Sequence, residues 1–271
     1  MGRTVLFLRP TRRAASTLQR LSARGIAARC LPLIGTFWPP DTGALDRALR
    51  RLAAGEYQQV MLTSVSTVQV FAERLAHLGL AGSLPPQTRW VAVGESTAAA
   101  ITRLLGQPVA FVPQRHSAAG LVAEYELPAG CPVLYAHGDL ASPVLADGLR
   151  GWDAKVDEVI AYFTRPLPHD QAAAIEPPTI EDLPVDALAR SVAESQVIVF
   201  SAPSIVNRFR ELYGSTLPPG TRTLMIGQPT ARAAAAAGLP SDLVAGNPDP
   251  DSLITAIEEL VGAMPEEKEE S

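Results

Sequence analysis

The chain has 271 residues, more than a single domain usually contains, so we expect two domains. Hydrophobic residues make up 47% of the chain and charged residues 19%, a composition that supports packed cores and argues against intrinsic disorder. The formal net charge is −5, and no basic stripe is interleaved with aromatic residues, so nucleic acid is not expected as a partner. An anionic ligand would have to be held by local groups.

The two cysteines, Cys30 and Cys131, stand alone without metal-ligand spacing, so we expect buried thiols in a reducing cytosol. The apolar run near the N-terminus is too short for a signal peptide, because Arg9 and Pro10 end it. No apolar stretch approaches membrane-spanning length without Arg, Pro or Gly. The sequence therefore predicts a cytoplasmic protein that does not insert into membranes.

Short apolar strands alternate with amphipathic helices in the first half of the chain. Thr11 is the expected N-cap of the first helix, and Gly25 is its expected stop. The proline-rich segment Thr36–Asp41 is expected to be a linker. The predicted strands are Thr4–Leu8, Ile26–Ile34, Gln59–Thr63, Trp90–Val93 and Val109–Val112, and the predicted helices include Arg12–Ala23, Thr42–Ala53 and one capped by Ser117.

The same pattern starts again at Cys131, after which a second proline-rich segment, Arg165–Leu183, is expected to be another linker. Strands that alternate with helices at short connections predict parallel sheets with helices on both faces. The repeat predicts two similar α/β domains. The predicted strands are Cys131–Ala136, Val156–Thr164, Val197–Phe200 and Asp242–Val244, and the predicted helices include Pro143–Leu149, Val185–Glu194 and an Asp251-capped helix over Ser252–Val261.

A glycine motif occurs twice, as VAVGESTAAAI around Gly94 and as LMIGQPTARAA around Gly227. Each copy predicts a strand end, a tight glycine turn and the start of a helix, and Pro229 suits a first helical position. Thr97 and Thr230 fall in the first turns of these helices. Free N–H groups and the helix dipole make such termini suitable for anions.

Four turns follow the carboxyl ends of predicted strands, where open α/β sheets bind their ligands. They contain Ser64, Gly94, Ser201 and Gly227, and Ser201 is expected to match Ser64 in the repeat. If the two domains face each other, these turns line one cleft.

Taken together, these residues resemble the uroporphyrinogen-III synthase family. The likeness rests on Arg9-Pro10, Thr63-Ser64, the paired glycine motifs, Tyr162-x-Thr164 and Ser201, in this order and spacing. It implies two flavodoxin-like, doubly wound α/β domains with mainly parallel sheets, joined by a two-strand linker and enclosing an active-site cleft. One domain would comprise residues 1–35 and 167–262, and the other residues 36–166, followed by a disordered acidic tail at 263–271.

The resemblance also implies a reaction, the closure of hydroxymethylbilane to uroporphyrinogen III with inversion of ring D, within tetrapyrrole biosynthesis. It implies a monomer with no metal or organic cofactor. The bilane also closes spontaneously without inversion, so the expected contribution of the protein is to position a flexible substrate.

Tyr162 is the catalytic candidate, because a phenol can donate a proton or hydrogen bond to the departing hydroxyl; the alternative is an ordinary aromatic on a linker strand. Substrate carboxylates are expected at helix N-termini, where the threonine hydroxyls either bind them or only cap the helices. Arg9, Arg12 and Arg13 cluster at the first helix, either for carboxylate binding or as solvated side chains. The predicted substrate-binding residues are Arg9, Arg12, Arg13, Ser64, Ser66, Gly94, Thr97, Ser201, Gly227 and Thr230.

Some positions depart from the family pattern, namely Leu8, Phe200, Ser66 and His137, and all four histidines are expected at the surface or in loops. These departures keep open a second interpretation, a two-lobed tetrapyrrole- or anion-binding sensor that has the cleft but not the chemistry. A nucleotide-dependent transferase is not supported, because no G-x-G-x-x-G or Walker motif follows a predicted strand.

Overall fold

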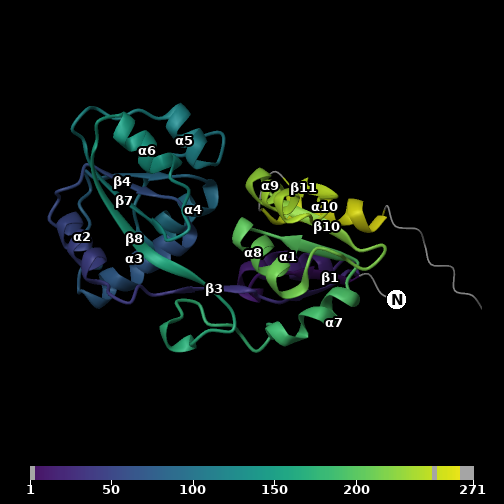
Figure 1. The fold of residues 1–271 in the computed structure, drawn as a ribbon. Coiled ribbons are helices and arrows are strands. Elements are labelled where there is room, and N and C mark those ends of the chain that lie inside the picture. Colours follow the sequence, from purple (N-terminus) through teal and green to yellow (C-terminus); the bar gives the residue numbers. More distant parts are fainter. Residues whose placement is uncertain (1–3, 246–248, 263–271) are drawn as a thin grey trace, which may run out of the picture. The chain divides into compact units, whose positions relative to one another are not determined.

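A computed structural model of the protein describes residues 4–245 and 249–262, so the predicted acidic tail at 263–271 lies outside the described residues. The chain forms two compact units (Figure 1). The first contains the described residues up to Gly35, Arg165–Gln171 and the described residues from Glu176 onward. The second contains Thr36–Thr164 and Ala172–Ile175. The first unit is therefore discontinuous in sequence.

The first unit is built on a five-stranded sheet with the order β11-β10-β9-β1-β2. All of its neighbouring strands pair in parallel, so their carboxyl ends share one edge. The strands are β1 (Thr4–Phe7), β2 (Ala27–Cys30), β9 (Val197–Phe200), β10 (Arg222–Ile226) and β11 (Leu243–Ala245).

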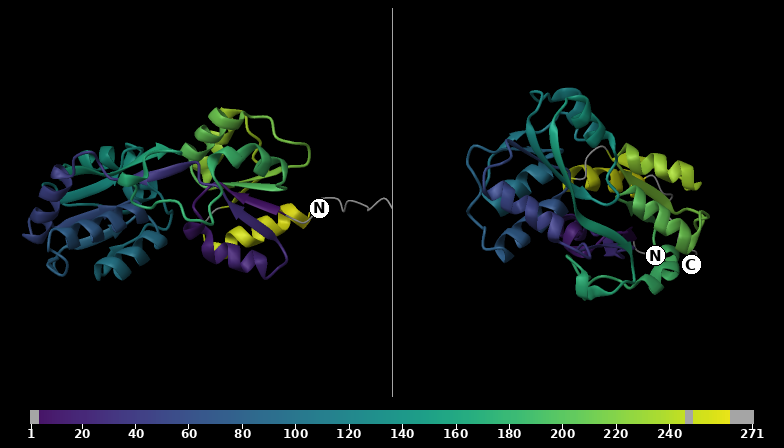
Figure 2. Two further views of the ribbon diagram at one scale, coloured as in Figure 1. Left: turned by 90° about the horizontal axis from the view of Figure 1, so that it is seen from below. Right: turned by 60° about the vertical axis from the view of Figure 1, so that its left-hand side comes forward.

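Helices cover both faces of this sheet, because alternate residues of the interior strand β1 are apolar on each side. Val5 and Phe7 pack with α1 (Thr11–Ser22) and α10 (Pro250–Gly262), which lie together in Figure 2. Leu6 and Leu8 pack on the other face. The helices of that face are α7 (Leu188–Ala193), α8 (Pro203–Tyr213) and α9 (Gln228–Ala237).

The second unit is built on a six-stranded sheet with the order β3-β8-β7-β4-β5-β6. One face carries α2 (Gly43–Ala53), α3 (Val65–His77) and α4 (Glu95–Ala100), which continues as a π-helix over Ile101–Leu105. The other face carries α5 (Ala118–Glu124) and α6 (Val144–Gly151). The strands are β3 (Ile34–Phe37), β8 (Lys155–Pro166), β7 (Pro132–Gly138), β4 (Gln59–Leu62), β5 (Arg89–Ala92) and β6 (Val109–Phe111).

Both sheets contain the strand order 2-1-3-4-5 that defines the flavodoxin-like fold. In the first unit, β1, β2, β9, β10 and β11 take these positions in chain order. In the second unit, β7 and β8 take positions 1 and 2, and β4, β5 and β6 take positions 3, 4 and 5. The strands that come last in the chain thus take the first positions, so the second unit is a circular permutation of the first. The predicted α/β class with mainly parallel sheets is confirmed.

Strand pairing allows the two units to be aligned residue by residue. Counting along the paired strands, Arg9 in the first sheet corresponds to His137 in the second, and Gly227 corresponds to Gly94. The pairs that fix this alignment are Val5↔Val197 and Val197↔Arg222 in one sheet, and Val133↔Gln59 and Gln59↔Arg89 in the other.

Three predictions about the bounds and caps of strands and helices were wrong. The predicted strand Ile26–Ile34 is two strands in different sheets, β2 and β3, separated at Pro32, which cannot donate to a sheet ladder. Thr11 is the first helical residue of α1 and not its cap. The carboxylate that accepts from Ser252 N at the start of α10 belongs to Asp249 rather than to Asp251.

The proline-rich segment after β8 is anchored to both units. Trp38 N donates to Ala173 O and Ile175 N donates to Thr36 O, both at 2.9 Å, which holds Ala172–Ile175 in the second unit. Further along, Leu183 N donates to Cys30 O at 2.8 Å beside the edge strand β2. Hydrogen bonds between distant parts of the sequence therefore fix this segment.

Candidate active site

The second unit brings Ser64 and Tyr162 together at the carboxyl edge of its sheet. Ser64 follows β4, Tyr162 lies on β8, and β7 separates these two strands. In the 2-1-3-4-5 order, the junction of β4 and β7 is the topological switch point, where connections leave toward opposite faces and flavodoxin-like folds bind ligands. The predicted catalytic residue therefore lies beside a position favoured for ligands by topology.

Ser64 is the N-cap of α3, as its residue type favours. Its Oγ accepts from Thr67 N at 3.2 Å and lies 2.9 Å from Thr67 Oγ1. The same Oγ lies 3.2 Å from the Tyr162 hydroxyl, and either atom can donate. Because the cap holds the Ser64 side chain in one rotamer, the Tyr162 hydroxyl has a rigid hydrogen-bond partner.

A second tyrosine, Tyr135, lies near Tyr162 but is buried inside the second unit. Tyr135 is only 2% exposed, and burial raises the pKa of its phenol to about 12. Tyr162, in contrast, is half-buried on β8, where it pairs with the last residue of β7. Of the two phenols, Tyr162 is the one that a substrate can reach.

The two glycine corners differ in conformation. Gly227 has φ +79°, a left-handed value that disfavours any side chain, whereas Gly94 has an extended φ of −161°. A Cβ added at Gly94 would lie 3.5 Å from His116 Cβ, which is an ordinary contact. Pro229 takes the second helical position of α9 and not the first.

The threonines of the two motifs are buried, Thr97 at 4% and Thr230 at 2% exposure. Thr230 Oγ1 donates to Ile226 O at 2.7 Å, so its proton already has a partner inside the fold. A hydroxyl in this arrangement cannot also donate to a carboxylate. Gly227 N, Thr230 N and Ala231 N also donate to backbone carbonyls, and Pro229 has no N–H, so this corner offers an anion few free donors.

Two further serines among the predicted site residues, Ser201 and Ser66, occupy positions different from that of Ser64. The N-cap of α8 is Ala202, so the counterpart of Ser64 in the first unit is Ala202, and Ser201 lies one residue earlier. Ser201 is half-buried at the carboxyl end of β9. Ser66 is inside the first turn of α3 and is 3% exposed. The expected match between the two serines was wrong by one residue.

Two of the three clustered arginines contact the chain itself. Arg12 donates to Pro177 O, and Arg13 forms an ion pair of 2.6 Å with Glu176. The N-terminus of α1 is closed by Asp182, whose Oδ1 accepts from both Thr11 N and Thr11 Oγ1 at 2.7 Å. A carboxylate of this chain therefore occupies the helix N-terminus at which a substrate carboxylate was considered.

Arg9 has different surroundings from its two neighbours. Its guanidinium lies over the Phe7 ring at 5.3 Å, and its buried Nε has no hydrogen-bond partner among the described residues. Burial lowers the pKa of this guanidinium, because the charged form loses solvation. Arg9 follows β1, next to the end of β9 and Ser201, at the switch point of the first sheet. This arrangement suits an arginine that binds an anion.

His137, which was expected at the surface or in a loop, is instead a buried residue near the end of β7, at 9% exposure. Its Nδ1 lies 2.8 Å from Gly138 O and its Nε2 lies 3.0 Å from Glu158 Oε1. Its ring lies 4.6 Å from that of Tyr135, as Arg9 lies over Phe7. Sequence reasoning missed this residue, although its place before a glycine at the end of an apolar strand was a usable signal.

Comparison with known proteins adds an independent observation. The sequence matches, over residues 15–255, the model of a family described as uroporphyrinogen-III synthase HemD. The chain belongs to the uroporphyrinogen-III synthase family. The predicted resemblance is confirmed. No curated protein matches the sequence in a direct search.

Solved uroporphyrinogen-III synthases share the fold. A mutant of the enzyme from the extreme thermophile Thermus thermophilus is 20% identical, with a TM-score of 0.62, over 97% of this chain and 100% of that chain. The uroporphyrinogen-III synthetase from Helicobacter pylori is 16% identical, with a TM-score of 0.53, over 95% of this chain and 99% of that chain. At these identities the likeness concerns the fold.

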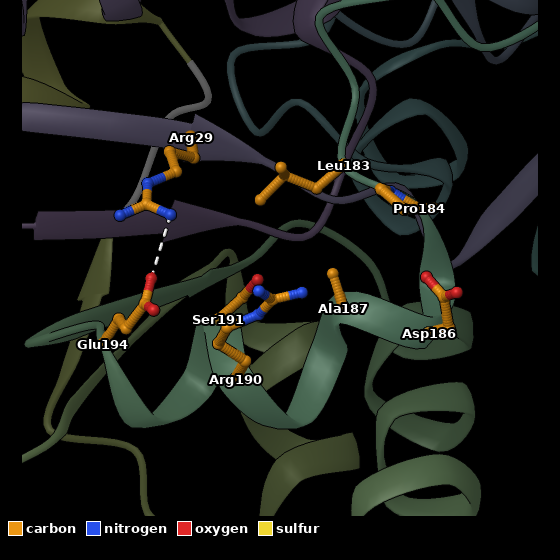
Figure 3. Close-up of a pocket in the computed structure, with 8 residues that line it drawn as sticks. All are labelled: Arg29, Leu183, Pro184, Asp186, Ala187, Arg190, Ser191 and Glu194. Carbon is orange, nitrogen blue, oxygen red and sulfur yellow. Dashed lines mark hydrogen bonds and ion pairs between the residues drawn. The ribbon is translucent and has the colours of Figure 1, made fainter.

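Two pockets of this family member lie away from the predicted site residues. One, of about 460 Å³, is bounded by β2 and α7, where Arg29 and Glu194 form an ion pair of 2.9 Å (Figure 3). The other, of about 380 Å³, lies at the amino ends of β4 and β5, around Gln59 and Arg89. Neither is lined by Tyr162, Ser64 or Arg9. Strand topology, and not pocket volume, therefore defines the candidate site.

Among the described residues, no helix is long and apolar enough to cross a membrane. The same residues contain no group of three or more His, Cys, Asp or Glu side chains arranged to hold a metal ion.

Proposed function

We propose that this chain catalyses the ring-inverting closure of hydroxymethylbilane to uroporphyrinogen III. The observation that carries the proposal is the hydrogen-bonded pair of Ser64 and Tyr162 at a topological switch point of a family member. The family match favours this enzyme over a sensor module that has lost the chemistry.

Tyr162 assists departure of the substrate hydroxyl. When Ser64 donates to the phenol oxygen, the phenol O–H is free to donate to the leaving oxygen. Loss of the hydroxyl gives an azafulvene, an electrophile that the pyrrole carbon at the other end of the bilane attacks. Closure with inversion of ring D passes through a spiro intermediate.

Each pyrrole of the bilane carries two carboxylates, so the site must bind many negative charges on a chain that is itself acidic. In the second unit, backbone N–H groups at the start of α3 supply donors without added charge. Arg9 supplies a cation whose burial is compensated when an anion binds beside it. In the first unit, Ser201 directly follows β9 and Gly227 directly follows the neighbouring strand β10, so both lie at the carboxyl edge of that sheet.

Positioning accounts for most of the catalysis in this proposal. Closure without inversion proceeds without a catalyst, so the protein must favour one geometry of a flexible chain over another. Holding one pair of reacting carbons together lowers the entropic barrier to that closure and leaves the competing closure unassisted. The reaction as written transfers protons and eliminates water, and it balances without an oxidant or reductant.

The direct test is to supply purified protein with freshly prepared hydroxymethylbilane and to separate the product isomers chromatographically. The proposal predicts mainly the ring-inverted isomer, against the uninverted isomer in a control without protein. Tight binding of bilane with only the uninverted product would support the sensor interpretation instead. A cytoplasmic location and a monomeric state remain predictions of the sequence.

A further inference from the structure

Gly138, at the end of β7, lies directly beneath the ring of Tyr162. A Cβ added to Gly138 would lie 2.5 Å from Tyr162 Cζ, 2.6 Å from Cε2 and 2.7 Å from the hydroxyl oxygen. Carbon atoms do not approach one another this closely without displacement, so the present ring position requires a residue without a side chain. Gly138 is not among the glycines with positive φ, so an alanine could adopt its backbone conformation. The restriction at Gly138 therefore comes from the ring.

A β-bulge directs Tyr162 toward this glycine. His137 pairs with Ile160, but Gly138 pairs with Tyr162, so Ala161 is the extra residue of β8. A bulge of this kind changes the direction in which the next side chain points. Without the bulge, Ala161 would face Gly138.

Asp139 holds the segment beyond the bulge. Its backbone N–H donates to Tyr162 O at 3.0 Å, and its Oδ1 accepts from Thr164 N at 2.8 Å. Both bonds are made by β8 backbone groups on the carboxyl-terminal side of the Tyr162 Cα. The backbone of Tyr162 is thus fixed to β7, while its ring rests on Gly138 and its hydroxyl reaches Ser64 at 3.2 Å.

We infer that Gly138 is a positioning residue for the reaction: its missing side chain lets the Tyr162 ring lie against β7, with the hydroxyl within reach of Ser64 and of the bilane's leaving group. The inference rests on the proposed function of Tyr162. It adds a residue that touches no reacting atom and acts only through the tyrosine ring.

The test is a double-mutant cycle of Gly138→Ala and Tyr162→Ala, with kcat, KM and the product isomer ratio as readouts. In the parent protein, Gly138→Ala should lower kcat by about 10- to 100-fold with little change in KM, because the displaced phenol no longer meets the leaving oxygen. In the Tyr162→Ala background, the same change should have no further effect, because the ring is absent. Gly151→Ala is the matched control, since a Cβ at Gly151 meets nothing within 4 Å.

The outcomes separate this inference from the proposed function. Parent protein that makes no inverted product would contradict the function itself. An active parent whose kcat is unchanged by Gly138→Ala, or two kcat losses that multiply independently, would overturn only the role of Gly138. If Gly138→Ala fails to fold, the double variant must fold again, because removing the ring makes room for the methyl group. Failure of both to fold would also overturn the inference.

A second readout does not depend on turnover. Protein labelled with 3-fluorotyrosine contains five labelled rings, and the ¹⁹F signal of Tyr162 is assigned by its loss in Tyr162→Phe. Gly138→Ala should shift that signal and leave in place the signal of Tyr213, which belongs to the other unit. An unmoved Tyr162 signal would contradict the steric argument.

Discussion

The two sheets carry different functional groups at equivalent points of the same strand order. At the junction of β4 and β7, the second unit places the Ser64–Tyr162 hydroxyl pair and the buried His137. At the junction of β1 and β9, the first unit places Arg9, whose Nε has no partner among the described residues. A duplicated scaffold can thus give one copy proton-donating groups and the other copy charge, because the switch point exists in both.

The aligned basic residues illustrate this division. His137 lies between two acceptors, Gly138 O and Glu158, whereas Arg9 lies over the Phe7 ring at 5.3 Å. A side chain whose polar atoms are occupied contributes to the fold. A buried polar atom without a partner, such as Arg9 Nε, lowers the stability of the empty site, and it gains a hydrogen bond when an anion binds beside it. The following predictions test this difference between the two edges.

Tyr162→Phe should have the largest effect. The substituted ring still fits over Gly138, but the hydroxyl that meets Ser64 is lost. We expect kcat to fall by about 10- to 100-fold, which is at the low end for loss of a general acid, and the free energy of unfolding to fall by no more than about 1 kcal/mol. Steady-state kinetics and chemical denaturation measure both. Tyr213→Phe is the control, and equal losses in the two variants would refute a special role for Tyr162.

Arg9→Met should separate binding from stability. We expect KM for the bilane to rise by about tenfold with kcat nearly unchanged, because a charge-assisted contact of about 1.5 kcal/mol is lost. The melting temperature should hold or rise, since a half-buried side chain whose Nε lacks a partner among the described residues is replaced by an apolar chain of similar length.

Arg12→Met is the matched control for Arg9, because Arg12 donates to Pro177 O of the same chain. Its KM should stay within about twofold of the parent value, below the effect of one charge-assisted hydrogen bond. A larger KM effect in Arg12→Met than in Arg9→Met would reverse the assignment of the anion-binding arginine.

The glycine corners should respond unequally to alanine. Gly227→Ala should lower the free energy of unfolding by about 1–2 kcal/mol, because φ +79° is costly for an L-residue. Gly94→Ala should change it by less than about 0.5 kcal/mol, since its backbone is extended and the new methyl group has room. Urea denaturation of both variants measures the difference. Equal losses would mean that the corners are more alike than their backbone angles indicate.

Cys30 should give the smallest effect at neutral pH, because its contribution changes only at alkaline pH. Burial raises the pKa of its thiol to about 11, so the folded state holds the proton more tightly than the unfolded state. Stability from this group is therefore complete below pH 9 and is lost as the pH rises toward 11. We expect a decline of about 2 kcal/mol over this range, which should be shallower in Cys30→Ala. Identical pH slopes would show that the thiol does not contribute.

Local patterns in the sequence were sufficient for much of the fold. Apolar periodicity gave the alternation of strands and helices, residue type identified the cap Ser117, and Ser64 was expected in the turn where it caps α3. These features depend on neighbours within a few residues, so they can be inferred without tertiary structure. Gly106 is another local feature: it ends the helical segment Ile101–Leu105 in a left-handed conformation, which glycine adopts readily.

Features that depend on distant residues could not be inferred. Asp182 caps α1 from 171 positions away, which no local pattern indicates. The one-residue offset between Ser201 and Ser64 becomes visible only through strand register. The bulge that aims Tyr162 at Gly138 is likewise a property of two paired strands. Sequence could nominate Tyr162 and Ser64 separately, but the tertiary structure was needed to bring them within 3.2 Å.

The isomer ratio of the product, measured across a series of protein concentrations at fixed hydroxymethylbilane, tests the account most directly. Spontaneous closure competes with the protein, so the fraction of ring-inverted product should rise from near zero toward one as protein is added. The same series with Tyr162→Phe should reach that fraction only at higher concentrations. A fraction that stays near zero at every concentration would contradict the proposed function.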